Sequence, residues 1–151
     1  TTHDLPPTLG YLAGDHVRLR DELGLLTEPL DDELAAARAE QVAWIDKLVA
    51  EGLLAAEDRD EPVEVMLGLH RFLRRTPSKV LLAALVDAVG ERRTQNQPGT
   101  VDEYPNWRIP LADGTGHRVS LEQIFEAELP DRVAAVMNGL DVQPDSRWDN
   151  R

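Results

Sequence analysis

The sequence contains no cysteine among its 151 residues. Disulfide bonds, thiol catalysis and cysteine-based zinc sites are therefore excluded for this chain, and we expect a reducing location, the cytoplasm. The histidines also lack the spacing of metal ligands, so we expect neither a metal site nor a cofactor. They are His3, His16, His70 and His117.

Positive charge and long apolar runs are scarce as well. Lys and Arg number 16 against 28 Asp and Glu, which gives a net charge of −12 at pH 7. Nucleic acids and anionic membranes bind through an excess of basic residues, so we expect neither as a partner. No apolar run approaches the ~18 residues of a membrane span. Neutral ligands such as sugars are compatible with this charge.

Several stretches have the pattern of amphipathic helices. Residues 31–51 are rich in alanine, place apolar residues at helical spacing, and end at Gly52. Residues 61–74 have Pro62 in the first helical turn, where proline is tolerated, and end before Pro77. Shorter helices are expected after Pro6-Pro7, over residues 15–26, from Ser120, and from Pro130 to Leu140.

Residues 79–86 are apolar almost throughout and predict a strand buried on both faces, as in a parallel sheet or barrel, although Ala and Leu also allow a helix. The alternation of helix and strand indicates an α/β fold. A buried parallel strand needs neighbours that this sequence does not supply. Either the segment is not a strand, or its partners lie in sequence outside the chain, which starts at Thr1 without an initiator Met.

Two motifs contain residues suited to sugar chemistry. His3-Asp4 follows the β-branched pair Thr1-Thr2, and Asp4 is either a helix cap or an active-site acid at the end of a strand. Residues 91–116 form a long polar loop that contains Asn96-Gln97-Pro98-Gly99-Thr100. In the same loop, Tyr104 and Trp107 either stack on sugar rings or hold the loop to the core. For these two residues and for Asn106 we favour a structural role.

Together these motifs resemble those of the 4-α-glucanotransferases (amylomaltases, or disproportionating enzymes) of glycoside hydrolase family 77. The resemblance rests on Thr2-His3-Asp4-Leu5-Pro6, on Gly10-Tyr11, and on the order Asn96-x-Pro-Gly-Thr and then Asn106-Trp107-Arg108. It extends over about residues 1–140. The loop motif is the specific part, because the Thr-His-Asp part is shared with relatives of α-amylase.

The resemblance implies that residues 1–140 are the C-terminal part of a catalytic (β/α)8 barrel, itself mostly helical, with a flexible tail at 141–151. Thr2 to Asp4 would end the seventh strand, and Lys79 to Leu85 would be the eighth. In this family one Asp is the nucleophile, one Glu is the acid/base, and a second Asp stabilises the transition state. Asp4 matches the stabilising Asp, and His3 matches a substrate-binding histidine. Asn96 is a donor-subsite contact or a purely structural residue.

The resemblance further implies transfer of α-1,4-glucan segments between maltodextrins by a retaining double displacement. The segments that carry the nucleophile and the acid/base are absent, so we expect the chain alone to be inactive. An α-amylase-type hydrolase and a non-enzymatic acidic helical interaction module are the alternatives. The Asn96 loop argues against the hydrolase, and the module would use Thr2-His3-Asp4 only as a helix cap.

Overall fold

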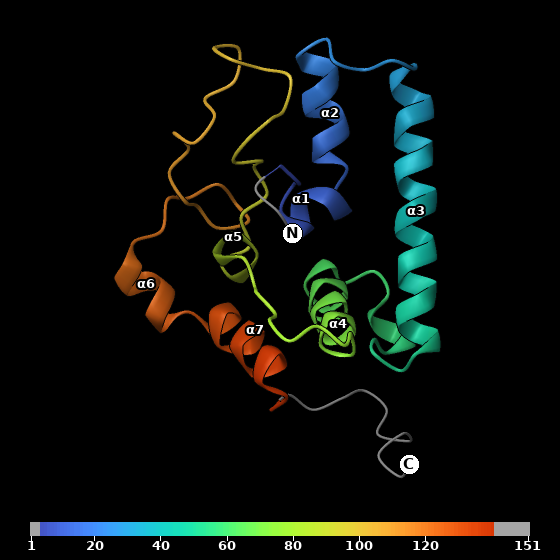
Figure 1. Cartoon of the computed structure of the whole chain (residues 1–151), viewed down its shortest axis with the longest axis vertical. Coiled ribbons are helices and arrows are strands. Elements are labelled where there is room, and N and C mark those ends of the chain that lie inside the picture. The colour runs from blue at the N-terminus through green and yellow to red at the C-terminus, as the bar shows by residue number, and fades with distance from the viewer. Residues whose placement is uncertain (1–3, 141–151) are drawn as a thin grey trace.

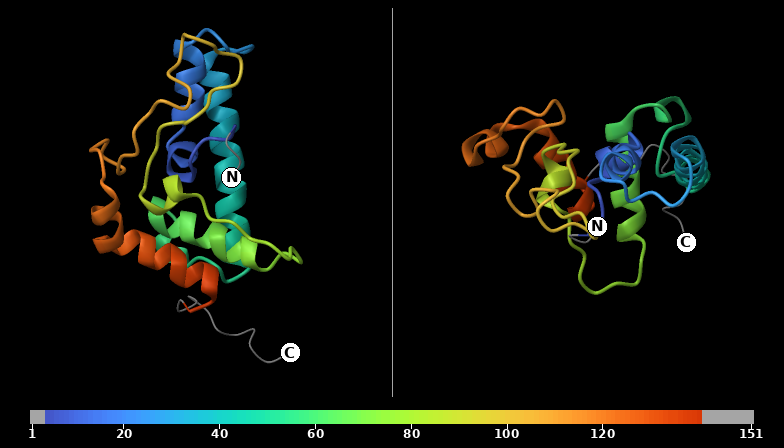
Figure 2. Two further views of the ribbon diagram at one scale, coloured as in Figure 1. Left: turned by 60° about the vertical axis from the view of Figure 1, so that its left-hand side comes forward. Right: turned by 90° about the horizontal axis from the view of Figure 1, so that it is seen from above.

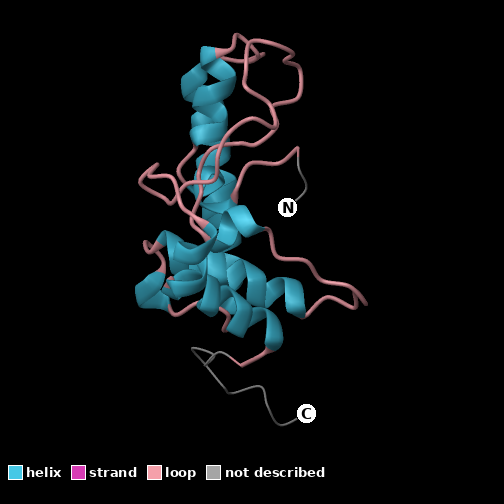
Figure 3. Ribbon diagram, turned by 90° about the vertical axis from the view of Figure 1, so that its left-hand side faces the viewer, coloured by secondary structure: helices cyan, strands magenta, loops and turns pink. Residues whose placement is uncertain are grey.

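The computed structural model describes residues 4–140, which consist of α-helices joined by long connections (Figures 1 and 3). α1 (Thr8–Leu12) and α2 (Asp15–Glu22) are short and are separated by Gly14, whose φ of 74° turns the chain between them. α3 (Leu30–Ala50) is the longest described helix and packs beside α2 (Figure 1).

α4 lies at the centre of the molecule. After a 3₁₀ turn, η1 (Ala56–Asp58), α4 (Pro62–Arg74) packs against α1, α3 and α7 (Figures 1 and 2). The short α5 (Leu85–Ala88) follows, and a long loop then leads to α6 (Leu121–Glu126) and α7 (Glu128–Asn138).

Two clusters of buried side chains form the core, one on each side of α4. The first joins α4 to α3 and to the turn after it, through Ile45, Leu48, Leu53, Leu54 and Val65. The second joins α4 to α5 and α7, through Met66, Leu67, Ala88, Val133 and Val136. α4 therefore determines where α3, α5 and α7 lie.

The structure confirms the helical predictions to within a few residues. The stretch expected at 31–51 is α3, and the one expected at 61–74 is α4. Ser120 caps α6 in a reciprocal capping box, because its side chain accepts from the Gln123 N–H and the Gln123 side chain accepts from the Ser120 N–H.

The strand predicted at 79–86 is wrong for the described structure. Residues 79–84 are irregular, α5 begins at Leu85, and the segment projects from the helices (Figures 2 and 3). Val80 and Leu82 are 74% and 79% exposed. The reason is physical: a strand exists through hydrogen bonds to a neighbour, and within residues 4–140 the only bridge pairs Ala112 with Arg118.

The long loop is confirmed, and it continues from Glu91 to the cap of α6. In the described part of the chain, no helix is long and apolar enough to cross a membrane. His3, the strand end expected at residues 1–2 and the tail expected at 141–151 lie outside the described residues.

Candidate active site

The structure brings together two of the predicted site residues. The side-chain amide Nδ2 of Asn96 donates a hydrogen bond to Oδ1 of Asp4 over 2.7 Å, although the two residues are 92 positions apart in sequence. Asp4 is exposed and Asn96 is half-buried, and their contact lies at the surface. The carboxylate and the amide together offer acceptors and donors to sugar hydroxyls.

Further contacts pair the segments that carry Asp4 and Asn96, residues 4–15 and 87–96. Thr8 donates to the Asp87 carboxylate through its backbone N–H at 2.7 Å and its hydroxyl at 3.0 Å. Farther along, the Arg92 guanidinium makes two hydrogen bonds to Asp15, at 2.8 and 2.9 Å. Such paired contacts fix geometry as well as adding energy.

Gly10 allows the closest approach between the two segments. A Cβ atom built at Gly10 would collide with the backbone oxygen of Arg92 and lie 3.1 Å from its carbonyl carbon. Only glycine, which has no side chain, lets α1 pack this closely against the backbone of residue 92. The sequence match at Gly10-Tyr11 therefore marks a packing requirement of the site.

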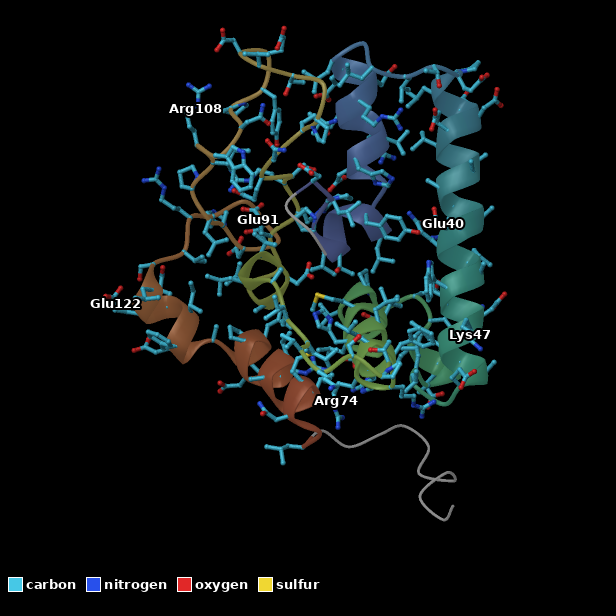
Figure 4. The ribbon with its side chains drawn as sticks, in the orientation of Figure 1. Glu40, Lys47, Arg74, Glu91, Arg108 and Glu122 are labelled. Carbon is cyan, nitrogen blue, oxygen red and sulfur yellow. The ribbon has the colours of Figure 1, made fainter. Side chains whose placement is uncertain are left out.

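Glu91 fixes the base of the loop that carries Asn96. Its carboxylate is 1% exposed and accepts from the backbone N–H groups of Arg92, Arg93 and Ala112 at 2.9–3.0 Å. The Arg93 guanidinium adds contacts at 2.9 and 2.7 Å. Figure 4 shows Glu91 between α5 and the loop, whereas Arg108 points away from the body.

The surroundings of Glu91 keep its carboxyl ionised. Burial by itself would raise its pKa, but the hydrogen bonds from Arg93 and from the Ala112 N–H outweigh burial and lower the pKa below its usual range. A charged acceptor at the base of the loop thus holds residues 91–93 next to Ala112.

Asn106 shapes the tip of the same loop. Its Oδ1 accepts from the Gln97 N–H at 2.7 Å, and its Nδ2 donates to the Thr100 hydroxyl at 2.8 Å. Tyr104 donates from its hydroxyl to the Thr94 carbonyl at 2.6 Å. These bonds give Asn106 and Tyr104 a structural role, as we favoured from the sequence, although their partners lie within the loop itself and not in the core.

Trp107 differs from these two residues. It is 63% exposed and has a φ of 61°, which is rare for a bulky residue. The backbone N–H of Trp107 donates to the Gln95 carbonyl at 2.9 Å. Trp107 therefore lies next to the part of the loop that carries Asn96.

Sequence reasoning missed Asp87 and Glu91. Both are at most 2% exposed, and each accepts from a residue far away in sequence: Asp87 from Thr8, 79 positions away, and Glu91 from Ala112, 21 positions away. The available signal was their position directly after an apolar run, where a carboxylate is drawn into the core and must find donors. In the described residues no group of three or more His, Asp or Glu side chains could hold a metal ion.

Comparisons with known proteins agree with the motifs. The profile of a family described as 4-alpha-glucanotransferase, glycoside hydrolase family 77, matches residues 1–115. The 4-alpha-glucanotransferases of Mycobacterium bovis and Mycobacterium tuberculosis are each 53% identical over 148 residues, which is 98% of this chain. The crystal structure of amylomaltase from Corynebacterium glutamicum superposes with a TM-score of 0.84 at 43% identity, over 96% of this chain and 21% of that one. The chain thus spans about a fifth of the length of the curated relatives.

Proposed function

Because this chain belongs to the 4-alpha-glucanotransferase family, glycoside hydrolase family 77, we propose that it is part of an enzyme that transfers α-1,4-glucan segments between maltodextrins. The observation that carries this proposal is the 2.7 Å contact between Asp4 and Asn96. The contact joins the two motifs by which the chain resembles the family, and it places a carboxylate and an amide together at the surface.

We further propose that the whole enzyme has a (β/α)8 barrel, in which residues 79–84, irregular in the structure of this chain, form the eighth strand once the first and seventh strands lie beside them. The exposed Val80 and Leu82 support this arrangement, because an apolar segment of this kind requires cover. A cavity of about 400 Å³ between Leu5, Leu82 and helices α3 and α4 supports it as well. Asp4 and Asn96 would then follow strands seven and eight at the C-terminal face, where barrel enzymes carry their active sites.

The proposed chemistry is a retaining double displacement. A carboxylate attacks the anomeric carbon of the donor while a carboxylic acid protonates the departing glycosidic oxygen, and the donor's C1–O bond breaks. The 4-hydroxyl of an acceptor glucan then attacks the same carbon, loses its proton to the carboxylate that had acted as the acid, and displaces the nucleophile. We place the nucleophile and the acid/base in sequence outside this chain.

Asp4 acts during both steps. It accepts hydrogen bonds from hydroxyls of the distorted sugar and places negative charge beside the ring as positive charge develops on it. Asn96 binds the same donor sugar, and its bond to Oδ1 orients the Asp4 carboxylate. His3 contacts hydroxyls of the sugar at the cleavage site. No metal or cofactor takes part in this scheme, and the enzyme works in the cytoplasm.

Product analysis tests this proposal. The full-length protein that carries this sequence is incubated with maltotriose, and glucose, longer maltodextrins and total reducing ends are followed together. Transfer forms one glycosidic bond for each bond broken, so we expect glucose and longer products while reducing ends stay constant. A rise in reducing ends that matches glucose release would contradict transfer and indicate the hydrolase. No turnover at all would contradict both enzymes.

A further inference from the structure

Asp87 is a buried carboxylate whose contacts lead to the candidate active site. It lies in α5, is 2% exposed, and accepts both the backbone N–H and the hydroxyl of Thr8. On its other side, Nε2 of His70 lies 4.0 Å from Oδ2. His70 is itself held by α4, because its Nδ1 lies 2.9 Å from the Met66 carbonyl. Asp87 is therefore surrounded by groups that the core keeps in place.

Thr8 is the first residue of α1, and only three residues separate it from Asp4. Two of the three are Pro6 and Pro7, whose rings fix their φ angles. The connection from Thr8 back to Asp4 is thus short and stiff. The first N–H groups of a helix have no partner inside that helix, and Asp87 supplies an acceptor for one of them. The orientation of α1 at Thr8 consequently sets where Asp4 lies.

Asp87 also lies nine residues before Asn96, at the start of the second of the paired segments. Its bonds to Thr8 therefore tie the segment that carries Asp4 to the segment that carries Asn96. We propose that Asp87, acting through Thr8, is a positioning residue that places the Asp4 carboxylate against the donor sugar. This inference rests on the proposed transferase function and extends it to a residue that does not touch the substrate.

A positioning role predicts a specific kinetic result in the full-length protein. Asp87→Ala should lower kcat for maltotriose disproportionation by about 10²-fold, because misplacing a catalytic group by about 1 Å costs that much. KM should change little. Asp87→Asn keeps an oxygen that accepts from the Thr8 N–H, and its side-chain NH₂ can donate to the Thr8 hydroxyl. The Asp87→Asn variant should therefore retain most of the kcat that Asp87→Ala loses.

The decisive measurement is the fold-loss of kcat that Asp87→Ala causes in the Asp4→Ala background. With no carboxylate left to place, Asp87→Ala should cause little further loss, since residues that act as a unit are not additive. An equal fold-loss in both backgrounds would overturn the positioning role and leave Asp87 merely structural. An unchanged kcat in a folded Asp87→Ala protein would also overturn it.

Two further variants keep the test decisive. If Asp87→Ala does not fold, Thr8→Val removes only the hydroxyl contact at 3.0 Å, and its several-fold loss of kcat should likewise vanish in the Asp4→Ala background. A Thr8→Val loss that persists there would overturn the proposal.

Asp113→Ala is the matched control. The Asp113 carboxylate also accepts from the N–H and the hydroxyl of one threonine, Thr115, but it does so in an exposed turn, so the kcat of this variant should stay unchanged. If Asp4→Ala alone has no effect, the proposed function itself fails, which this design separates from a failure of Asp87.

Discussion

Replacing Asp4 with asparagine in the full-length protein is expected to lower kcat for glucan transfer by about 10³-fold, the effect of losing a major electrostatic contact in a transition state. The substitution preserves shape and keeps the oxygen that accepts from Asn96 at 2.7 Å, so the contact between the paired segments should remain. What disappears is the negative charge beside the developing oxocarbenium ion. That charge matters most in the transition state, so kcat should fall much more than KM changes.

The measurement is a steady-state rate of glucose release from maltotriose. Asp102→Asn provides the control, because Asp102 is an exposed carboxylate in the same loop and its removal changes net charge equally. The control should keep the rate of the unmodified protein. If Asp4→Asn retained more than about a tenth of the rate, Asp4 would not have the role assigned to it.

Replacing Gly10 with alanine is expected to destabilise the fold by about 3 kcal/mol, at the upper end of the cost of overpacking. The direction of the change in stability is informative, because replacing glycine with alanine inside an exposed helix normally stabilises the helix by about 1 kcal/mol. Here the added methyl group collides with the backbone oxygen of Arg92, which cannot rotate away as a flexible side chain would. Either α1 or the backbone at residue 92 must shift, and both lead to site residues.

Urea unfolding of the 151-residue chain measures this cost. Gly24→Ala is the matched control: unlike Gly10, Gly24 has no other atom within 4 Å of an added Cβ, but its φ is +67°. The control should therefore lose only the 1–2 kcal/mol of left-handed strain. If Gly10→Ala is no more destabilised than Gly24→Ala, the close packing of α1 on the residue-92 backbone is not as described.

The helices of this chain were predictable because their signals are local. The apolar stripe and Gly52 delimit α3, and Pro62 marks the start of α4. The secondary structure of residues 79–86 was not predictable in the same way, because an apolar run shows only that the segment must be buried against other residues. Whether it becomes a strand depends on partners elsewhere, and in residues 4–140 none pairs with it.

The site was predictable only through a resemblance to known motifs. Asp4 and Asn96 were identified by matching residues, whereas nothing in their own neighbourhoods shows that they meet. The groups that bring them together, Asp87 with Thr8 and Gly10 with Arg92, are contacts between segments far apart in sequence. A single sequence does not show such pairings, and their physical cause is tertiary packing around α4.

Glucose release from maltotriose, measured on the 151-residue chain alone and on the full-length protein, decides whether this chain holds only part of an active site. The chain carries Asp4 and Asn96 but, in our proposal, neither the nucleophile nor the acid/base. We therefore expect release by the full-length protein and none by the chain alone. Turnover by the chain alone that Asp4→Ala abolishes would contradict this conclusion.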